Sequence, residues 1–333
     1  MKGKKFFDDL VETIQQDSAL DEAAKAAVYR NFTKLKDTKV NLLITGATGC
    51  GKSSTINALF NTDHAKVGQG VDPETMEITR YELDNIVLFD SPGLGDGKDA
   101  DIRHSKGIIE KLFEKDERGV PLIDLVLVIL DGSSRDLGTS FELINSVIIP
   151  NLGDDHSRLL VAINQADMAM KGRFWNQETN QPESALVSFL EEKVTSTKRR
   201  IKEATDVDVD PIYYSAGYKD AGQAQKPYNL SKLLLQILRH TKAEKRAVFA
   251  QDVNTDEQMW RDDDRLLDYR KEIQLTVIDS IKINASIGSD MGGEIGSAIG
   301  SLLGKKGQIL GEVGGKVAGA LIGGVVGFFR SFF

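Results

Sequence analysis

Residues 46–53 read GATGCGKS, a G-x-x-x-x-G-K-S pattern whose residue types are suited to holding nucleotide phosphates. Its glycines let successive backbone N–H groups point at one phosphate, while Lys52 reaches the β- and γ-phosphates and the Ser53 hydroxyl binds Mg²⁺. The apolar run 40–44 precedes the pattern, and the helix-prone stretch 54–60 follows it and adds the positive end of its dipole. The residues that we predict to hold the phosphates are Gly46, Thr48, Gly49, Cys50, Gly51, Lys52, Ser53 and Ser54.

The composition restricts the class of protein that carries this loop. The 333 residues are 41% hydrophobic and 28% charged, which is ordinary for a globular chain with a sizeable core. The net charge of −8 argues against a general nucleic-acid binder, because phosphate backbones are held by concentrated Lys and Arg. The lone cysteine, Cys50, excludes an internal disulfide, fits a reducing cytosol and most simply fills a variable loop position. We expect no secretory signal, because the basic N-terminus lacks an apolar core.

Hydrophobic periodicity divides the chain into four regions. The first repeats apolar residues at three- and four-residue steps, which predicts helices. In the second, apolar runs alternate with amphipathic stretches, which predicts an α/β fold with a mainly parallel sheet and helices on both faces. The third is charged and helix-prone, and the fourth is rich in glycine. The regions are 1–37, 38–241, 242–284 and 285–333. The expected strands are 39–45, 78–83, 86–90, 124–130, 158–163 and 211–215, and the expected helices of the α/β region are 53–61, 102–117, 139–149, 184–204 and 229–240.

The last 49 residues hold 14 of the 31 glycines, most of them at a period of four. On a helix this spacing forms a stripe without side chains, which another backbone can approach closely. Because glycine costs about 1 kcal/mol relative to alanine in a helix, so many glycines predict two packed helices, a glycine-zipper hairpin with its turn at 304–307. The longest uncharged run, 317–329, would rise only about 20 Å as a helix. A membrane contact and a packed contact with this chain or a partner therefore both stay open.

A carboxylate and a glycine follow the expected strand 86–90 in a pattern suited to a nucleotide. Asp90 can hold Mg²⁺ through water. Gly93 can offer its backbone N–H to a γ-phosphate, because no side chain blocks the approach. Alone, such a stretch is typical of a turn. Its place after a buried strand, downstream of the phosphate loop, favours a segment that responds to the nucleotide.

The stretch after residue 163 carries residues that can distinguish bases. The Asp167 carboxylate can accept hydrogen bonds from N1–H and the 2-amino group of guanine, a donor pair that adenine lacks. Asn164 can bridge this stretch to the phosphate loop and contact the base N7. Backbone N–H groups near Ser215 and Ala216, after the last expected strand, can meet the guanine O6. Each motif is weak alone, but together they predict a guanine nucleotide.

Four motifs in this order resemble the signature set of P-loop GTPases of the translation-factor class: 46–53, 90–93, 164–167 and 215–217. With 71–75 included, the chain is most similar to the Era-like and septin-like bacterial branch. The resemblance covers about 40–240 and implies GTP hydrolysis, with GTP/GDP and Mg²⁺ as cofactors. It also implies that Thr75, or Thr79 in its place, is the switch threonine. By this resemblance Lys52, Thr75 and Gly93 serve catalysis, and Ser53, Thr75 and Asp90 hold the metal.

Two positions depart from the family pattern. Gln165, which we also assign to the nucleotide, replaces the lysine whose stem covers the base, so guanine specificity should survive through Asp167 with lower affinity. Leu94 stands where small regulatory GTPases place a water-orienting glutamine, and leucine cannot form a hydrogen bond. We therefore expect slow intrinsic hydrolysis, or a catalytic group supplied by a homodimer across the nucleotide face. No arginine finger can be assigned.

The sequence thus predicts a cytoplasmic GTP-binding switch that hydrolyses GTP slowly. Its hairpin, 285–333, would act in an oligomer, against a partner helix, or at the inner membrane as a peripheral or inserted segment. A septin-like module that assembles through bound nucleotide with little catalysis is one alternative. A ribosome-assembly GTPase is another, which the acidic balance and the lack of an RNA-binding motif after residue 241 weaken.

Overall fold

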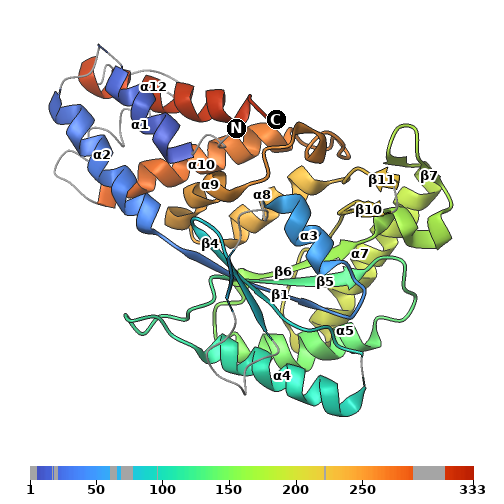
Figure 1. Cartoon of the computed structure of the whole chain (residues 1–333). Helices are drawn as coiled ribbons and strands as arrows, with labels where there is room; N and C mark the ends of the chain where they lie inside the picture. Colours follow the sequence, from blue (N-terminus) through green and yellow to red (C-terminus); the bar gives the residue numbers. More distant parts are fainter. Residues whose placement is uncertain are drawn as a thin grey trace.

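The structure, a computed structural model, describes residues 6–16, 18, 22–60, 66–68, 78–95, 97–220, 223–287 and 312–333. Its centre is a seven-stranded sheet (Figure 1). The strands are β1 (Val40–Gly46), β2 (Lys66–Gly68), β3 (Thr79–Glu82), β4 (Ile86–Asp90), β5 (Leu125–Asp131), β6 (Leu159–Asn164) and β9 (Ile212–Tyr213). They follow the order β2-β3-β4-β1-β5-β6-β9. The β2–β3 and β3–β4 pairs are antiparallel, and the other neighbours are parallel.

The predicted α/β fold with a mainly parallel sheet is confirmed. Each predicted strand is present within a few residues of its expected bounds. The central strands β1, β5 and β6 are buried on both faces, which explains their continuous apolar runs. β2 was not predicted, because three residues at the edge of a sheet carry too little periodicity to be recognised.

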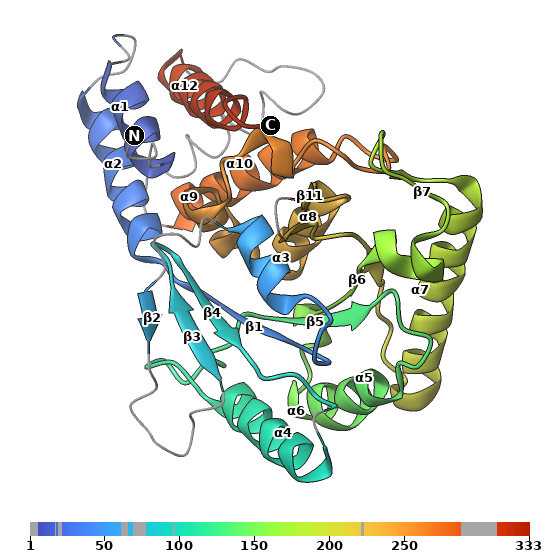
Figure 2. The same cartoon turned by 45° about the vertical axis from the view of Figure 1, so that its right-hand side comes forward.

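Helices cover both faces of the sheet (Figures 1 and 2). One face carries α3 (Lys52–Leu59) and α8 (Leu230–His240). The other face carries α4 (Lys98–Phe113), α5 (Gly138–Glu142), α6 (Ile149–Asn151) and α7 (Ser184–Thr205). The predicted helix 139–149 is α5 and α6 joined by a π-helical stretch, Leu143–Ile148. Alternate strand residues feed two cores: Leu42 and Ile44 face the α3 side, and Leu43 faces the α4 side.

The two ends of the chain form one helical unit on the α3 side of the sheet (Figure 2). We define the helical unit as α1 (Phe6–Gln16), α2 (Glu22–Asp37), α9 (Phe249–Asp252), α10 (Tyr269–Ile287) and α12 (Glu312–Phe329). α1 contacts both α2 and α12, and α10 contacts α8, α2 and α12. Apolar side chains of α1 and α12 belong to the same continuous core as the inner face of β1. The N-terminal helices therefore pack against both the α/β region and the C-terminal segment.

Aromatic side chains hold α1 and α12 together. The ring of Phe6 lies 4.8 Å from that of Phe328, and Phe329 stacks on Phe333 with ring centroids 5.1 Å apart. Phe333 in turn lies edge-on to Trp260, at 5.4 Å. Aromatic pairs of this kind add about 0.5–1.5 kcal/mol each beyond the area that they bury. The C-terminal end of the chain is therefore part of the core.

The glycines of α12 fall on two different faces. Gly324 faces α1, where an added Cβ would lie 2.5 Å from Leu10 Cδ2. Gly319, Gly323 and Gly327 repeat at a period of four on an exposed face, where an added Cβ would meet no atom of the described residues within 4 Å. The predicted turn at 304–307 and the first arm of the hairpin lie outside the described residues. Within the described parts of the chain, no helix is long and apolar enough to cross a membrane.

Candidate nucleotide-binding site

The predicted phosphate loop lies between β1 and α3, as the sequence analysis expected. Gly46, Gly49 and Gly51 have φ angles of +151°, +79° and +88°, which favour glycine. Space is a second constraint at two of these positions. A Cβ at Gly46 would lie 2.2 Å from the Ile129 carbonyl oxygen, and one at Gly51 would lie 2.3 Å from Asn164 Nδ2. The pattern therefore reflects both backbone curvature and the close approach of β5 and β6.

The polar side chains of the loop gather where α3 begins. The Lys52 ammonium lies 3.2 Å from the carbonyl oxygens of both Gly46 and Ala47, so it bends back over the loop. Ser53 is exposed in the first turn of α3. Cys50 is buried, and burial raises the pKa of its thiol to about 11. A thiol with this pKa is not reactive, which agrees with a space-filling role.

Asp90 is placed beside the loop by the parallel pairing of β4 with β1, in which it lies opposite Ile44. Its Oδ1 atom is buried, and no described residue forms a hydrogen bond with it. Burial raises the pKa of Asp90 to about 6, against the opposing charge of Lys52. A buried carboxylate oxygen without a partner is costly unless something binds it. Asp90 therefore fits the predicted magnesium ligand.

The segment after Asp90 is docked on the phosphate loop. The Leu94 N–H donates to the Gly46 carbonyl at 3.4 Å, and the Thr48 N–H donates to the Leu94 carbonyl at 3.0 Å. A Cβ on Gly93 would lie 2.3 Å from Thr48 Oγ1, so this position accepts only glycine without a shift of the loop. Thr75 lies outside the described residues. Thr79, its alternative, is the first residue of β3 and pairs with Asp90.

Asn164 joins the base-reading segment to the loop. It ends β6, its Nδ2 donates to the Cys50 carbonyl at 2.9 Å, and its Oδ1 accepts the Ala216 N–H at 2.9 Å. The predicted bridge from Asn164 to the loop is therefore present. Gln165 adds a second one, because its Nε2 donates to the Gly49 carbonyl at 2.7 Å. Gln165 is predicted above to belong to the nucleotide site in place of the family's lysine, but its contact with Gly49 was not predicted.

Asp167 and the segment at 215–217 lie at the same edge of the sheet. Asp167 is buried in a short 3-10 helix, Ala166–Gly172, directly after β6. The Ser215 N–H donates to the Tyr228 carbonyl at 3.0 Å, and the Ala216 N–H donates to Asn164. The contact of this segment with guanine O6 stays a prediction. A cavity of about 350 Å³ adjoins it, with Ser54, Asn57, Ala216, Gly217, Tyr218 and Met259 among its lining residues.

One residue at the site carried no signal in the sequence. His104, on α4, is 9% exposed, and its Nδ1 lies 3.0 Å from the Gly93 carbonyl oxygen. No motif marks a histidine eleven residues beyond a glycine, so only the packing of α4 against the sheet reveals the contact. Because the ring fixes the peptide that follows Gly93, it helps to hold this segment on the loop.

The fold and these motifs define the class of protein. Residues 41–165 match the family model described as "50S ribosome-binding GTPase". This stretch runs from β1 through the phosphate loop and Asp90 to Asn164 and Gln165. The α/β region therefore has the P-loop GTPase fold, and its residues 41–165 are similar to GTPases of the translation-factor class.

Individual relatives resemble only part of the chain. The protein "Translocase of chloroplast 125, chloroplastic" of Physcomitrium patens is 34% identical over 128 residues, which are 36% of this chain and 10% of the relative. The "tRNA modification GTPase MnmE" of Dichelobacter nodosus is 29% identical over 131 residues, 39% of this chain and 28% of the relative. The chain thus spans well under half the length of either. A solved structure of Toc33 from Arabidopsis thaliana with GDP and Mg²⁺ is 16% identical, with a TM-score of 0.42, and covers 74% of this chain and 100% of that one.

Proposed function

We propose that the chain is a GTP-dependent switch of the Era-like and septin-like bacterial branch, with slow intrinsic hydrolysis and with the helical unit and segment 285–333 as its output. The contact of Asn164 with both Cys50 and Ala216 carries the proposal. It joins the phosphate loop, the base-reading segment and the segment after β9 at one edge of the sheet. A nucleotide bound there would contact all three at once.

Slow hydrolysis is supported by the position of Leu94. Its side chain is only 5% exposed and belongs to the core on the α4 side of the sheet. Both its N–H and its carbonyl are bonded to the phosphate loop. Leu94 can therefore neither orient a water molecule nor swing toward one without leaving the core. Catalysis would rest on positioning and on charge neutralisation by Lys52.

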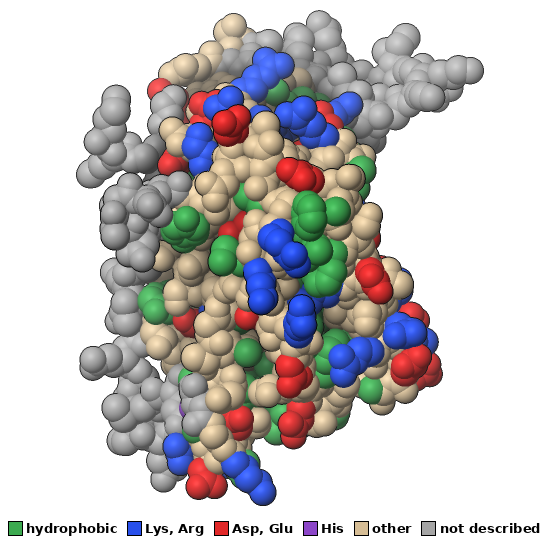
Figure 3. Space-filling view, turned by 90° about the vertical axis from the view of Figure 1, so that its right-hand side faces the viewer, with side chains coloured by type: hydrophobic (Ala, Val, Ile, Leu, Met, Phe, Trp, Pro, Cys, Tyr) green, Lys and Arg blue, Asp and Glu red, His purple; other side chains and the backbone are tan. Residues whose placement is uncertain are grey.

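A homodimer across the nucleotide face would supply the catalytic group that Leu94 cannot provide. Figure 3 shows that Lys and Arg side chains gather in the middle of the face that carries β7 (Trp175–Asn176) and α7, beside hydrophobic side chains. Met168, Phe174 and Tyr218 follow the base-reading motifs and are 49%, 40% and 46% exposed. A dimer would cover such apolar side chains. Phosphate release that rises more than linearly with protein concentration would support it, and stable bound GTP without release would favour the septin-like assembly module.

The proposal includes Mg²⁺, which Ser53 and Asp90 would hold, with Thr75 as the predicted third ligand. When bound, Mg²⁺ would neutralise charge on the phosphates. Lys52 would bind the same phosphates from the loop, and Gly93 would offer its N–H to the γ-phosphate. Asp90 must be ionised to serve as a ligand, so binding is linked to its protonation.

Mg²⁺-dependent GTP affinity is expected to fall as the pH drops through about 6, because the pKa of Asp90 is about 6 before metal binds. Below that pH, affinity should decrease by about tenfold per pH unit, since one proton must leave for each metal bound. Titration of a fluorescent GTP analogue between pH 8 and 5 would measure the effect. The phosphates of GTP titrate in the same range, so Asp90→Asn is the control. The two proteins should differ most at pH 8, and identical pH profiles would exclude Asp90 as a ligand.

The site of action is proposed to be a membrane surface or an oligomer in the cytoplasm, reached through the exposed glycine face of α12. Liposome flotation and size-exclusion chromatography, each with a GTP analogue and with GDP, would test it. Deleting 285–333 is not a clean test, because Val325, Phe329 and Phe332 are core residues. Gly323→Glu instead adds charge and bulk to the exposed face, and Thr33→Glu on α2 is a matched control. A full-length protein that neither floats nor assembles in either state would refute this part of the proposal.

A ribosome-associated role is the second candidate, favoured by the description of the matching family. The match ends at residue 165, so it includes none of the C-terminal helices of the helical unit, α9, α10 and α12. The net charge of −8 weighs against a broad contact with RNA. Co-sedimentation with 50S subunits in the presence of a GTP analogue would favour this candidate over a membrane or oligomer role.

A further inference from the structure

The turn between β3 and β4 is held by one carboxylate of the helical unit. Asp252, the last residue of α9, accepts the backbone N–H groups of Asp84 at 3.0 Å, Asn85 at 2.6 Å and Ile86 at 2.8 Å. Asp252 is 6% exposed, so these bonds are shielded from water. Hydrogen bonds to a buried ionised group are strong and depend closely on geometry. The turn therefore cannot shift without moving α9 or breaking these bonds.

The same turn is bonded to α2. The Asn85 side chain is 2% exposed, and its Nδ2 lies 3.3, 2.9 and 2.8 Å from the carbonyl oxygens of Leu35, Lys36 and Thr38. Leu35 and Lys36 lie in the last turn of α2, where no further helical turn follows to bond the carbonyls, and Thr38 comes directly after the helix. The Leu35 carbonyl also accepts the Thr38 N–H at 3.1 Å. Asn85 thus caps α2 from the sheet. The turn is fixed between α2 on one side and α9 on the other.

Gln251 connects the N-terminal helix to this arrangement. Its Oε1 accepts the Phe7 N–H of α1 at 3.3 Å, and its Nε2 donates to the Asp84 carboxylate at 3.3 Å. α1 in turn packs against α12 through Phe6 and Phe328. The helices from both ends of the chain are therefore linked to three consecutive residues of one turn.

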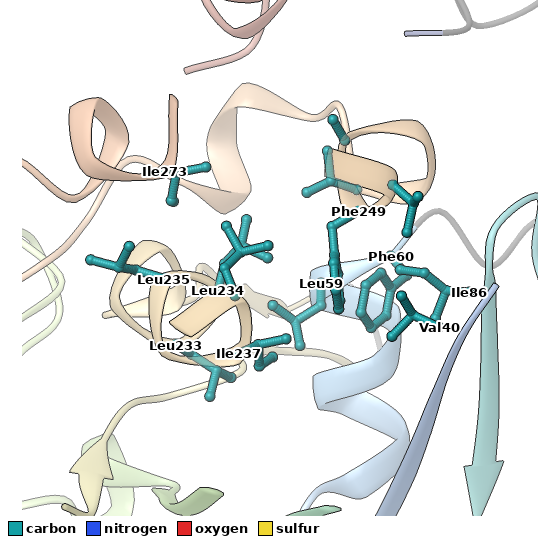
Figure 4. Close-up of a cluster of buried hydrophobic side chains, with 14 of the residues drawn as sticks. Val40, Leu59, Phe60, Ile86, Leu233, Leu234, Leu235, Ile237, Phe249 and Ile273 are labelled. Carbon is teal, nitrogen blue, oxygen red and sulfur yellow. The ribbon is translucent and has the colours of Figure 1, made fainter. Parts of the chain in front are cut away.

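The same segment also contacts the far end of α3. Figure 4 shows Phe249 of α9 beside Phe60, with Val40 and Ile86 next to them, and the two rings lie 6.5 Å apart. Phe60 also pairs with Val253 in an isolated bridge. α3 starts at Lys52, and β4 ends at Asp90. α9 thus contacts α3 and β4 at the ends that lie away from the nucleotide site. The opposite ends of α3 and β4 carry Lys52, which is predicted to bind phosphate, and Asp90, the predicted metal ligand.

We propose that the β3–β4 turn is a joint that couples the nucleotide site to the helical unit, with Asp252 and Asn85 as its positioning residues. This inference rests on the proposed function, because it needs a nucleotide at the loop. β3 and β4 pair without interruption from Glu82 and Val87 to Thr79 and Asp90, so the ladder moves as one piece. A displacement at Asp90 would therefore move the turn. Because the turn is closely packed, it would switch between distinct positions and would not shift by small steps. By linkage, the helical unit would then alter nucleotide affinity in return.

The test is amide hydrogen exchange on the full-length protein with Mg²⁺ and either a GTP analogue or GDP, with bound nucleotide measured in the same samples. In the unmodified protein, exchange in α1 and at the C-terminal end of α2 should differ between the two nucleotides. Asp252→Asn keeps the size of the side chain and places an NH₂ group where an acceptor stood. Exchange at residues 84–86 should become about tenfold faster, and α1 and α2 should stop responding to the nucleotide.

Asp256→Asn is the matched control, because Asp256 is exposed and accepts the N–H of the nearby Gln258 at 3.0 Å. A merely structural role of Asp252 would lower the thermal midpoint but leave the nucleotide response of α1 and α2 intact, which would overturn the inference. If Asp252→Asn fails to fold, hydrogen exchange in Gln251→Ala and in the unmodified protein tests the inference in its place. Bound nucleotide without any response in α1 and α2 overturns the inference alone. Absence of nucleotide binding overturns the proposed function and this inference together.

Discussion

Asp167→Asn is expected to lower the affinity for GTP by about 100-fold or more and to shift preference toward xanthosine triphosphate. The carboxylate would accept two hydrogen bonds from guanine, and hydrogen bonds to charged groups contribute about 1.5–3 kcal/mol each. Losing even 3 kcal/mol corresponds to about a 100-fold loss of affinity. Xanthine carries a carbonyl where guanine has its amino group, and the new amide can donate to it. Calorimetric titration with both nucleotides would measure the change.

The buried position of Asp167 makes the effect specific. It is 5% exposed and follows the last residues of β6, whose Asn164 is fixed to the loop. Asp210→Asn is the matched control, because Asp210 is exposed and pairs with Lys198 on the surface. The control should leave GTP affinity unchanged. If Asp167→Asn also leaves the preference for guanine intact, Asp167 does not read the base.

Gly51→Ala is expected to abolish measurable nucleotide binding and to lower the free energy of unfolding by about 2–4 kcal/mol, from backbone strain and a lost hydrogen bond. The added Cβ would lie 2.3 Å from Asn164 Nδ2, which is bonded to the Cys50 carbonyl. The amide must move, and its contacts with both the loop and Ala216 break together. Calorimetric titration and urea unfolding would measure the two effects.

The neighbouring glycine provides the control within the same loop. Gly49 has a similar φ, +79° against +88°, but a Cβ there would meet no atom within 4 Å in the described part of the chain. Gly49→Ala should therefore cost only the strain of a left-handed backbone, about 1–2 kcal/mol. Equal effects of the two substitutions would show that φ alone matters, and that the contact between Gly51 and Asn164 does not organise the site.

Local patterns determined much of the fold. The phosphate loop, the strands of the sheet and the order of the motifs follow from apolar periodicity and from residue types with special backbone or charge properties, such as Gly51, Lys52 and Asp90. These properties act over a few residues, so they leave a recognisable signal in the sequence. The short edge strand β2 left none. The hairpin turn at 304–307 stays a prediction, because it lies outside the described residues.

The tertiary structure decided which distant segments meet. Gln165 bonds to Gly49, His104 contacts Gly93, and Asp252 accepts three backbone N–H groups of the β3–β4 turn. Every residue except proline carries such an N–H, and every residue a carbonyl, so the partner of a buried polar side chain leaves no mark in the sequence. The motif at 46–53 and the motifs after it thus predicted, from the sequence alone, a nucleotide site at one edge of the sheet. That helices from both ends of the chain converge on the far side of this domain was visible only in three dimensions, because it depends on side-chain packing and hydrogen bonds between residues far apart in the sequence.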